Sequence, residues 1–451
     1  MKPRLTRFWV IPTFAVLASI VIVVVIADSN RHSFVAARGS DSAAVTFNRD
    51  IAPILFKNCA SCHRPGEVAP FSLLTYKDAA KRAKQIAAVT KSRYMPPWKP
   101  ELGYGEFHDA RRLSDEDLAR LTRWAETGAV EGNPADLPAA PQFTDGWQLG
   151  QPDLVLKMPQ AYTIKADGPD IYQVFVIPID IPADKFVSGF EFRPGNRRVV
   201  HHSLIFLDSN GEARRRDEAD PDVGYRSFGG IGFLPTGSIG GWAPGAFPRF
   251  LPEGIVKVIK KGSDLVLQMH YHPSGKSETD QSTIGIYFSK SSSKKLMVNI
   301  PLVQRNLKIP AGEQRYKVTA SLTMPIDLQA IGITPHMHLL GREMKVTAYL
   351  PDGTVLPMIW IKDWNFNWQD QYLYDKPLRL PKETRLELEA YYDNSADNPR
   401  NPSTPPRTVT WGEQTTDEMA FCPVQAIAEN ETEIKQLWPA ILRQLALQRG
   451  R

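Results

Sequence analysis

The segment Cys59-Ala60-Ser61-Cys62-His63 limits most strongly what this chain can fold into. Two cysteines separated by two residues and followed by a histidine form the attachment motif of c-type haem. The thiols bind the porphyrin vinyl groups as thioethers, and the histidine binds the iron from one side. A zinc site would need four ligands, and the only other cysteine is Cys422. A redox disulfide is the other alternative. We predict covalent haem on Cys59 and Cys62, with His63 as an axial ligand.

The N-terminus has basic residues followed by an apolar run from Phe8 to Ala27. The run is about as long as a membrane-spanning helix, and the positive charge before it places the N-terminus in the cytoplasm. Val25-Ile26-Ala27 also fits a signal-peptide cleavage site. The run is longer than the apolar part of most signal peptides, so we expect residues 1–28 to be an uncleaved anchor. Both alternatives export the remaining chain, which indicates a periplasmic protein, tethered to a bacterial inner membrane if the anchor is retained.

Residues 29–44 are small and polar and are typical of a linker. Residues 45–140 then show helical spacing of apolar side chains, most clearly over Tyr76–Ser92. A second helix is expected to begin after Ser114 and to stop at Gly128. Together with the haem motif, these features predict a small all-α cytochrome c domain over residues 45–140.

After Pro141 the chain changes to short alternating runs separated by Pro, Gly, Asp and Asn, a pattern typical of antiparallel strands. We predict a mainly β fold with two tandem antiparallel β-sandwiches of jelly-roll type, residues 141–300 and 301–451. The second ends in a helix over Glu431–Gln448. The expected strands are Leu154–Met158, Ile171–Ile179, Phe186–Phe192, Val199–Leu207, Leu265–Tyr271, Ile284–Phe288, Val318–Met324, Met344–Leu350, Thr354–Ile361, Arg385–Tyr392 and Thr408–Trp411.

Charge and cysteine content exclude two classes of protein. The formal net charge of +5 is small for 451 residues, and no basic cluster is interleaved with aromatic side chains. A nucleic-acid partner is therefore not expected. The chain has three cysteines, and the predicted haem takes two of them, so a disulfide framework is not expected either.

A cytochrome c needs a second axial ligand for its iron. Met95 is our candidate, because it follows a long helical pattern and lies in the proline-stiffened run Tyr94-Met95-Pro96-Pro97-Trp98. His108 is the rival ligand. The simpler alternative for Met95 is a buried packing residue.

Six further histidines form three close pairs, His201/His202, His270/His272 and His336/His338. Residues i and i+2 of a strand lie on one face, so the second and third pairs are expected to project together. His201 and His202 are adjacent, and their joint use needs a twist in the strand or different ring nitrogens. His272 is the weakest candidate because Pro273 follows it. Paired imidazoles on one strand face are a common beginning of a copper or zinc site.

Four segments occur in a fixed order: Val200-His201-His202-Ser203, Leu267-Gln268-Met269-His270-Tyr271, His336-Met337-His338-Leu339-Leu340-Gly341 and Thr416-Asp417-Glu418-Met419. With them, about residues 150–425 resemble the copper type II ascorbate-dependent monooxygenases. That family includes peptidylglycine α-hydroxylating monooxygenase and dopamine β-monooxygenase. A fused N-terminal cytochrome c resembles bacterial members of the superfamily.

The resemblance implies two copper ions, one in each sandwich. It implies that His201, His202 and His270 bind an electron-transfer copper. It implies that His336, His338 and Met419 form the catalytic, oxygen-binding copper site. Imidazoles suit a copper that changes oxidation state, and a thioether stabilises the reduced ion. Met419 is assigned from the resemblance alone.

The resemblance does not extend to the residues that hold a peptide. Thr334 stands where the peptide enzyme has the arginine that grips the substrate carboxylate, and Phe421 and Pro423 stand in place of its asparagine and tyrosine. A glycine-extended peptide substrate is therefore not expected. An apolar or aromatic pocket is favoured by Trp364, Phe366, Trp368 and Phe421, although such residues are more often core.

We predict a dicopper monooxygenase that hydroxylates a C–H bond of a small or apolar substrate with O2. Its coppers would be re-reduced through the fused haem, which a periplasmic electron donor supplies. The alternatives are a periplasmic electron-transfer or copper-handling protein without oxygen insertion, a copper oxidase, and an anchored scaffold whose histidines bind zinc or nothing.

Overall fold

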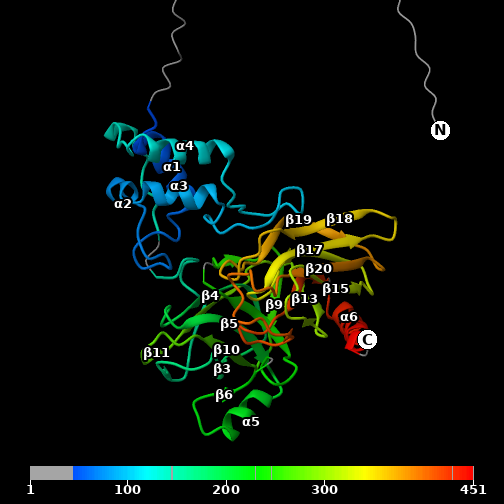
Figure 1. Cartoon of the computed structure of the whole chain (residues 1–451). Coiled ribbons are helices and arrows are strands. Elements are labelled where there is room, and N and C mark those ends of the chain that lie inside the picture. Colours follow the sequence, from blue (N-terminus) through cyan, green and yellow to red (C-terminus); the bar gives the residue numbers. More distant parts are fainter. Residues whose placement is uncertain (1–43, 144–145, 229, 245, 429, 450–451) are drawn as a thin grey trace, which may run out of the picture. The chain divides into compact units, whose positions relative to one another are not determined.

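The computed structural model describes residues 44–449 except 144–145, 229, 245 and 429 (Figure 1). The predicted anchor and nearly all of the predicted linker lie outside these residues. Within the described part, no helix is both long enough and apolar enough to cross a membrane. The predicted mainly β character is confirmed, with 35% of residues in strands and 17% in helices.

The helices before residue 140 surround a small apolar core. Its centre is Trp124, whose side chain is fully buried and whose Nε1 donates to the carbonyl of Val130 at 3.0 Å. The ring of Phe47 packs against it. The elements are η1 (Phe47–Ile51), α1 (Ala52–Asn58), α2 (Tyr76–Ala80), α3 (Ala83–Lys91), α4 (Asp115–Glu126) and η2 (Pro134–Asp136).

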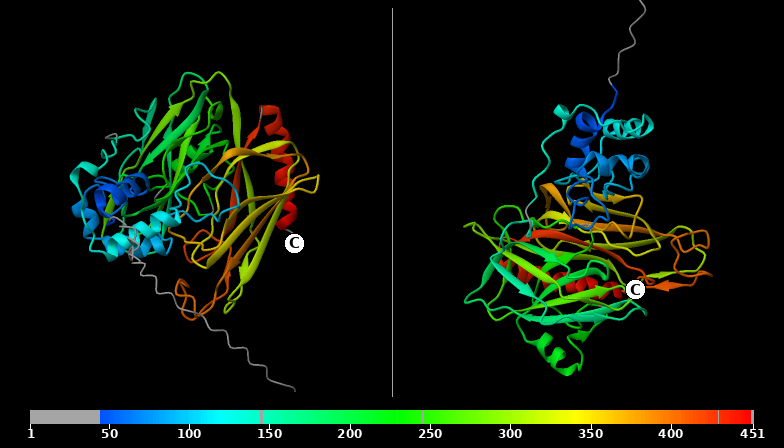
Figure 2. Two further views of the ribbon diagram at one scale, coloured as in Figure 1. Left: turned by 90° about the horizontal axis from the view of Figure 1, so that it is seen from above. Right: turned by 90° about the vertical axis from the view of Figure 1, so that its left-hand side faces the viewer.

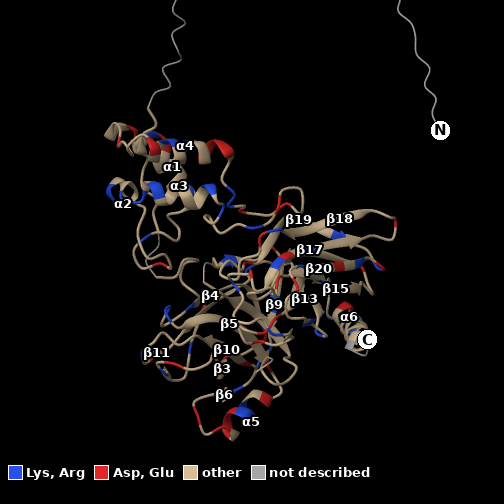
Figure 3. Cartoon of the chain, viewed as in Figure 1, with Lys and Arg blue, Asp and Glu red and all other residues tan. Residues whose placement is uncertain are grey.

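The sequence signals at both ends of α4 act as expected. Ser114 Oγ accepts a hydrogen bond from the Asp117 amide at 3.0 Å, and acidic residues fill the first turn, where the helix dipole favours them (Figure 3). Gly128 follows the helix with φ +91°, a conformation that glycine adopts without strain. The single helix predicted over Tyr76–Ser92 is wrong, because the chain turns between Ala80 and Ala83 and forms two helices.

The first half of the β region contains two sheets that share one apolar core. Buried side chains from one sheet, such as Ile205 and Leu267, belong to the same cluster as Phe192 and Ile286 from the other. The five-stranded sheet has the order β6 (Tyr225–Arg226), β3 (Ile171–Pro178), β10 (Asp264–Tyr271), β5 (Val200–Asp208) and β7 (Gly237–Trp242). The other consists of β1 (Leu154–Lys157), β12 (Thr283–Phe288), β4 (Lys185–Arg193) and β9 (Ile255–Ile259), with β8 (Arg249–Phe250) beside β4.

The second half repeats this arrangement around its own core, to which α6 (Glu431–Arg449) adds Leu437 and Ile441. Figure 2 shows α6, in red, lying along the strands of this half. One sheet is formed by β15 (Tyr316–Thr323), β20 (Arg385–Tyr392), β17 (Gly341–Tyr349) and β18 (Val355–Ile361); the other by β13 (Lys295–Gln304), β22 (Ala420–Ala428), β16 (Leu328–Ile333) and β19 (Tyr372–Leu380). The remaining elements are β2 (Tyr162–Ile164), β11 (Glu278–Asp280), β14 (Lys308–Ile309), β21 (Val409–Thr410) and α5 (Glu212–Ala219).

The two halves are joined by a shared sheet. Strand β9 pairs in parallel with β13, with Ile255 opposite Lys295 and Val256 opposite Leu296. One sheet of each half thus merges into a nine-stranded sheet. The boundary predicted between residues 300 and 301 falls inside β13.

Candidate metal centre

A β-bulge brings His201 and His202 to one site. In the pairing of β5 with β10, His202 lies opposite His270, but the next pair is Val200 with Tyr271. His201 is therefore an extra residue in its strand, and a bulge of this kind redirects a side chain. This accounts for two adjacent histidines serving one site, which a regular strand would point to opposite faces.

The ring nitrogens of His201, His202 and His270 converge. Nδ1 of His202 lies 3.2 Å from Nδ1 of His201 and 3.2 Å from Nδ1 of His270. The three side chains offer ligand atoms that all lie within 4.8 Å of one another. Imidazole nitrogens bind zinc at about 2.0–2.1 Å, so two ligands of such an ion lie roughly 3 Å apart. The group could bind a metal ion.

Burial keeps the imidazoles of His201 and His202 neutral. It lowers the pKa of His202 well below its usual value, with neighbouring His270 adding to the effect. Burial, again with His270, lowers the pKa of His201 to about 4. Since a metal binds only the neutral ring, both residues are available as ligands at neutral pH.

Asp170, which the sequence analysis missed, supports His270 from behind. Its Oδ2 lies 2.9 Å from Nε2 of His270, at an angle that does not meet the criterion for a hydrogen bond. The same oxygen accepts a hydrogen bond from the Thr415 hydroxyl at 2.6 Å. Its Oδ1 lies 2.7 Å from Nδ1 of His272. Although burial opposes this, these partners lower the pKa of Asp170 below its usual value. A carboxylate at Nε2 favours the tautomer with Nδ1 unprotonated, which is the nitrogen turned to the other histidines.

His272 stands outside the three-histidine group. Its side chain is 69% exposed and meets Asp170, and its amide donates to Val199. The structure thus gives it a place beside the group rather than in it.

His336 and His338 form a second cluster, between β16 and β17. Their ring centroids are 5.0 Å apart. Nδ1 of His336 donates to Oε1 of Gln369 at 2.5 Å, and Nδ1 of His338 donates to the carbonyl of Asp417 at 3.1 Å. Burial lowers the pKa of both, that of His338 to about 3. Both rings are therefore neutral, with Nε2 free of the proton and able to bind a metal.

The segment that contains Met419 is tied to this pair through Glu418. The buried carboxyl group of Glu418 accepts hydrogen bonds from the amides of His338 at 2.8 Å, Leu340 at 2.6 Å and Met419 at 3.2 Å. Burial raises the pKa of Glu418 to about 8 in spite of these donors. His336 also pairs with Phe421 in an antiparallel bridge. The backbone of Met419 is thereby fixed beside the two histidines.

One aromatic ring touches both clusters. Phe366 stacks on His201 with ring centroids 5.2 Å apart and meets the ring of His338 edge-on at 5.8 Å. The other aromatic residues of this segment have different partners. Trp364 is buried and donates from Nε1 to the carbonyl of His338 at 3.1 Å, while Trp368 contacts the ring of Tyr94 at 5.4 Å.

The haem motif forms a tight turn after α1. The His63 amide donates to the carbonyl of Cys59 at 2.8 Å, and both thiols of the motif are free. Nδ1 of His63 donates to the carbonyl of Phe71 at 3.1 Å. Burial lowers the pKa of His63, so the ring is neutral and its Nε2 can bind iron. These residues fit a covalently bound haem.

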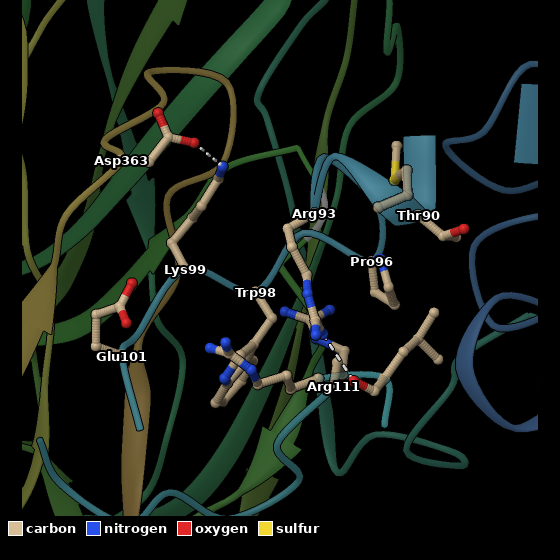
Figure 4. Close-up of a pocket in the computed structure, with 11 residues that line it drawn as sticks. Thr90, Arg93, Pro96, Trp98, Lys99, Glu101, Arg111 and Asp363 are labelled. Atoms are coloured by element: carbon tan, nitrogen blue, oxygen red, sulfur yellow. Dashed lines mark hydrogen bonds and ion pairs between the residues drawn. The ribbon is translucent and has the colours of Figure 1, made fainter. Parts of the chain in front are cut away.

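The two candidates for the second haem ligand lie in different surroundings. His108 is 64% exposed and lies between Asp109 and Asp375, at 3.5 and 3.7 Å. Met95 is half-buried in a hollow shown in Figure 4. The hollow is lined by Thr90, Arg93, Met95, Pro96, Trp98, Lys99, Glu101, Arg111, Arg112, Leu113 and Asp363.

Thr334 and Pro423, two of the residues that depart from the peptide enzyme, meet in the structure. The Thr334 amide donates to the carbonyl of Pro423 at 3.0 Å, and its hydroxyl accepts a hydrogen bond from Nε2 of Gln425 at 3.1 Å. Thr334 therefore has partners within the fold and carries no charge for a substrate carboxylate.

Comparisons with known proteins add little. No family model and no curated protein matches the chain. The structure is weakly similar to PNGF-II in two crystal forms, with TM-scores of 0.26 and 0.27, 8% identity, and coverage of 60% and 61% of this chain and 65% of each of those. The VP2 subviral particle of infectious bursal disease virus gives a TM-score of 0.18 and 10% identity over 62% of this chain and 73% of that one. The chain thus spans about two thirds of the PNGF-II structures, and likeness this low carries no argument about function.

Proposed function

We propose that this chain is a copper-dependent monooxygenase that hydroxylates a C–H bond with O2 and receives its electrons through a covalent haem c. The observation that carries the proposal is the convergence of three Nδ1 atoms, from His201, His202 and His270. Copper is proposed as the metal because the four ligand segments resemble those of the copper type II ascorbate-dependent monooxygenases.

The proposal includes a finer description of the fold. Each half of the β region is a β-sandwich of jelly-roll type, supported by one apolar core between two sheets in each. The helical part around Trp124 is a cytochrome c domain. Residues 1–28 anchor the chain in the inner membrane, and the rest lies in the periplasm.

Each group of side chains has its own role. His201, His202 and His270 would hold the copper that passes electrons, and His336, His338 and Met419 would hold the copper at which oxygen binds. When bound, the coppers supply the redox chemistry that inserts one oxygen atom into the substrate and releases the other as water, using two electrons and two protons.

The surrounding residues prepare these ligands without changing chemically. Gln369 and the carbonyl of Asp417 hold the proton on Nδ1 of His336 and His338 and thereby present Nε2. The ring of Phe366 contacts one imidazole of each cluster, His201 and His338. Thr334 carries no charge, which favours a small or apolar substrate over one with a carboxylate.

Counting metals tests the proposal. Iron and copper per chain would be measured on protein matured in a host that attaches haem c. We expect one iron and two coppers, and the loss of about one copper in His270→Ala and in Met419→Ala. His272→Ala is the matched control, since its side chain lies outside the cluster, and should keep both. A chain with iron but no tightly bound copper contradicts the proposal. Oxygen uptake without a hydroxylated product would leave a copper oxidase, and bound copper without oxygen uptake would leave an electron-transfer or copper-handling protein.

A further inference from the structure

Arg111 lines the hollow that contains Met95, and it also contacts a ring that lines a second hollow, which contains Cys62. It lines the hollow of Met95, where its guanidinium carbon lies 5.8 Å from the ring centre of Trp98 (Figure 4). The same carbon lies 4.9 Å from the ring centre of Phe247. Phe247 lines the second hollow, which contains Cys62. If Cys62 and Met95 held a haem, Arg111 would be the cation that lines the Met95 hollow and contacts the lining of the Cys62 hollow.

Arg111 brings a fixed positive charge to the surroundings of Met95, the candidate axial ligand. A haem bound there brings two propionate carboxylates and an iron whose charge rises on oxidation. Charges interact strongly in such partly buried surroundings, where the effective dielectric constant is far below that of water.

Arg111 also reaches into the β region. Its Nη2 donates to Oδ2 of Asp370 at 2.5 Å, and the two side chains are only 18% and 9% exposed. Asp370 directly follows Gln369, whose Oε1 accepts the hydrogen bond from His336. One ion pair therefore joins the surroundings of the haem motif to the segment that orients a predicted copper ligand.

The other cations of the Met95 hollow have different partners. Arg93 donates to the carbonyl of Leu113 and to Asp115, and Lys99 pairs with Asp363 (Figure 4). Arg112 approaches the carbonyl of Pro100. Asp363 directly precedes Trp364, so the Lys99–Asp363 pair also reaches the surroundings of His338, but its carboxylate is 74% exposed, unlike that of Asp370.

We propose that Arg111 sets the charge environment of the haem and links it, through Asp370, to the segment that orients His336. This rests on the proposed haem site. A fixed positive charge beside a haem favours the reduced iron and raises its reduction potential, and the adjacent carboxylate partly cancels that effect. Arg111 and Asp370 are thus positioning residues with opposite electrostatic effects on one cofactor.

The test is a redox titration of the haem in the full-length protein, followed by its visible absorption. In Arg111→Gln we expect the ratio of reduced to oxidised haem at a fixed applied potential to fall about tenfold, a shift of about 59 mV for a one-electron couple. In Asp370→Asn the ratio should rise. Arg111→Lys keeps the positive charge, so its haem should have a reduction potential close to that of the wild type.

Arg120→Gln provides the control, because it makes the same charge change on the exposed face of α4. It should leave the potential unchanged. Equal potentials in wild type and Arg111→Gln overturn the inference, and so do shifts of the same sign in Arg111→Gln and Asp370→Asn, which loosened packing alone would produce. A chain that carries no covalent haem overturns the proposed function, whereas haem that is present but indifferent to Arg111 overturns this inference alone.

Discussion

His201 and Phe366 stack with ring centroids 5.2 Å apart and planes 19° from parallel, although 165 positions separate them in the sequence. The edge of the same phenyl ring meets His338. A single side chain from the segment before β19 is thus in contact with a histidine of each cluster. The two clusters therefore share one neighbouring side chain, and a substitution of Phe366 should alter the environment of both His201 and His338.

Removing this ring should change the titration of the histidines. In metal-free Phe366→Ala, water gains access to His201 and His338, whose low pKa values are caused first by burial. We expect both pKa values to rise toward the ordinary value of about 6.5. NMR of protein with labelled histidine would measure this. Phe250→Ala removes a largely exposed ring elsewhere and serves as the control; unchanged histidine titrations in Phe366→Ala contradict the prediction.

Asp170→Asn should weaken metal binding at the three-histidine group. The amide cannot hold His270 with the charge of a carboxylate, and loss of such a partner behind a metal-bound histidine costs about 10–100-fold in metal affinity. Competition with a chelator of known affinity would measure the change. Asp167→Asn, an exposed residue of the same loop, should bind metal as the wild type does. Equal affinities in all three proteins would contradict a role in metal binding and leave Asp170 as a partner of Thr415 and His272 alone.

Trp364→Phe should reduce stability by about 1–3 kcal/mol, since it leaves the buried carbonyl of His338 without its donor. Denaturant unfolding of the metal-free protein would measure the loss. Trp360→Phe is the matched control. It removes the same indole N–H, but the Nε1 of Trp360 donates to the side chain of Glu343 in β17 and not to a buried backbone carbonyl, so we expect a smaller loss of stability. A larger loss in the control than in Trp364→Phe would count against the role assigned to Trp364.

The metal-free protein should be most stable near pH 6.5. His201 and His338 have folded-state pKa values of about 4 and 3, so below about 6.5 the unfolded chain binds more protons than the folded one. Stability therefore falls as the pH drops from about 6.5 toward 4. His202 and His336 are shifted in the same direction.

Glu418 has the opposite effect. Its folded-state pKa is raised to about 8, so the folded chain holds a proton that the unfolded chain loses near its ordinary pKa of about 4.3. Stability is lost as the pH rises through this range, and above 6.5 no histidine offsets it. Thermal unfolding across pH 4–9 should show the maximum, and Glu418→Gln should remove the decline on the alkaline side. A curve that keeps rising to pH 8 contradicts the assignment.

Apolar runs bounded by turn residues were enough to place the two strands that contain His201, His202 and His270. β5 and β10 lie within a residue of the predicted ranges. β5 alternates in part between buried and less buried positions, whereas every position of β10 is buried. The bulge at His201 could not be predicted, because it depends on the register with a strand about seventy residues away. Asp170 and Gln369 were missed for the same reason. Both are polar residues in loops, and nothing in the sequence shows that the folded chain brings them next to His270 and His336.

The strands omitted from the prediction, such as β13 and β22, have another explanation. β22 contains Pro423 and Cys422 within a run of mostly buried positions, and β13 contains Pro301. A proline within an apolar run argues against a central strand, yet here the two prolines lie opposite each other in the pairing of β13 with β22. α5 was also missed, and its highly charged sequence has little apolar periodicity.

The parallel pairing of β9 with β13 has a consequence for any attempt to study the halves separately. A chain cut between β12 and β13 would leave each half with a strand whose backbone donors and acceptors had lost their neighbour. Such unpaired edges associate readily with other chains. We expect the isolated halves to aggregate or to reassemble with each other, and a protease that nicks the connection to leave the two pieces associated until denaturant separates them.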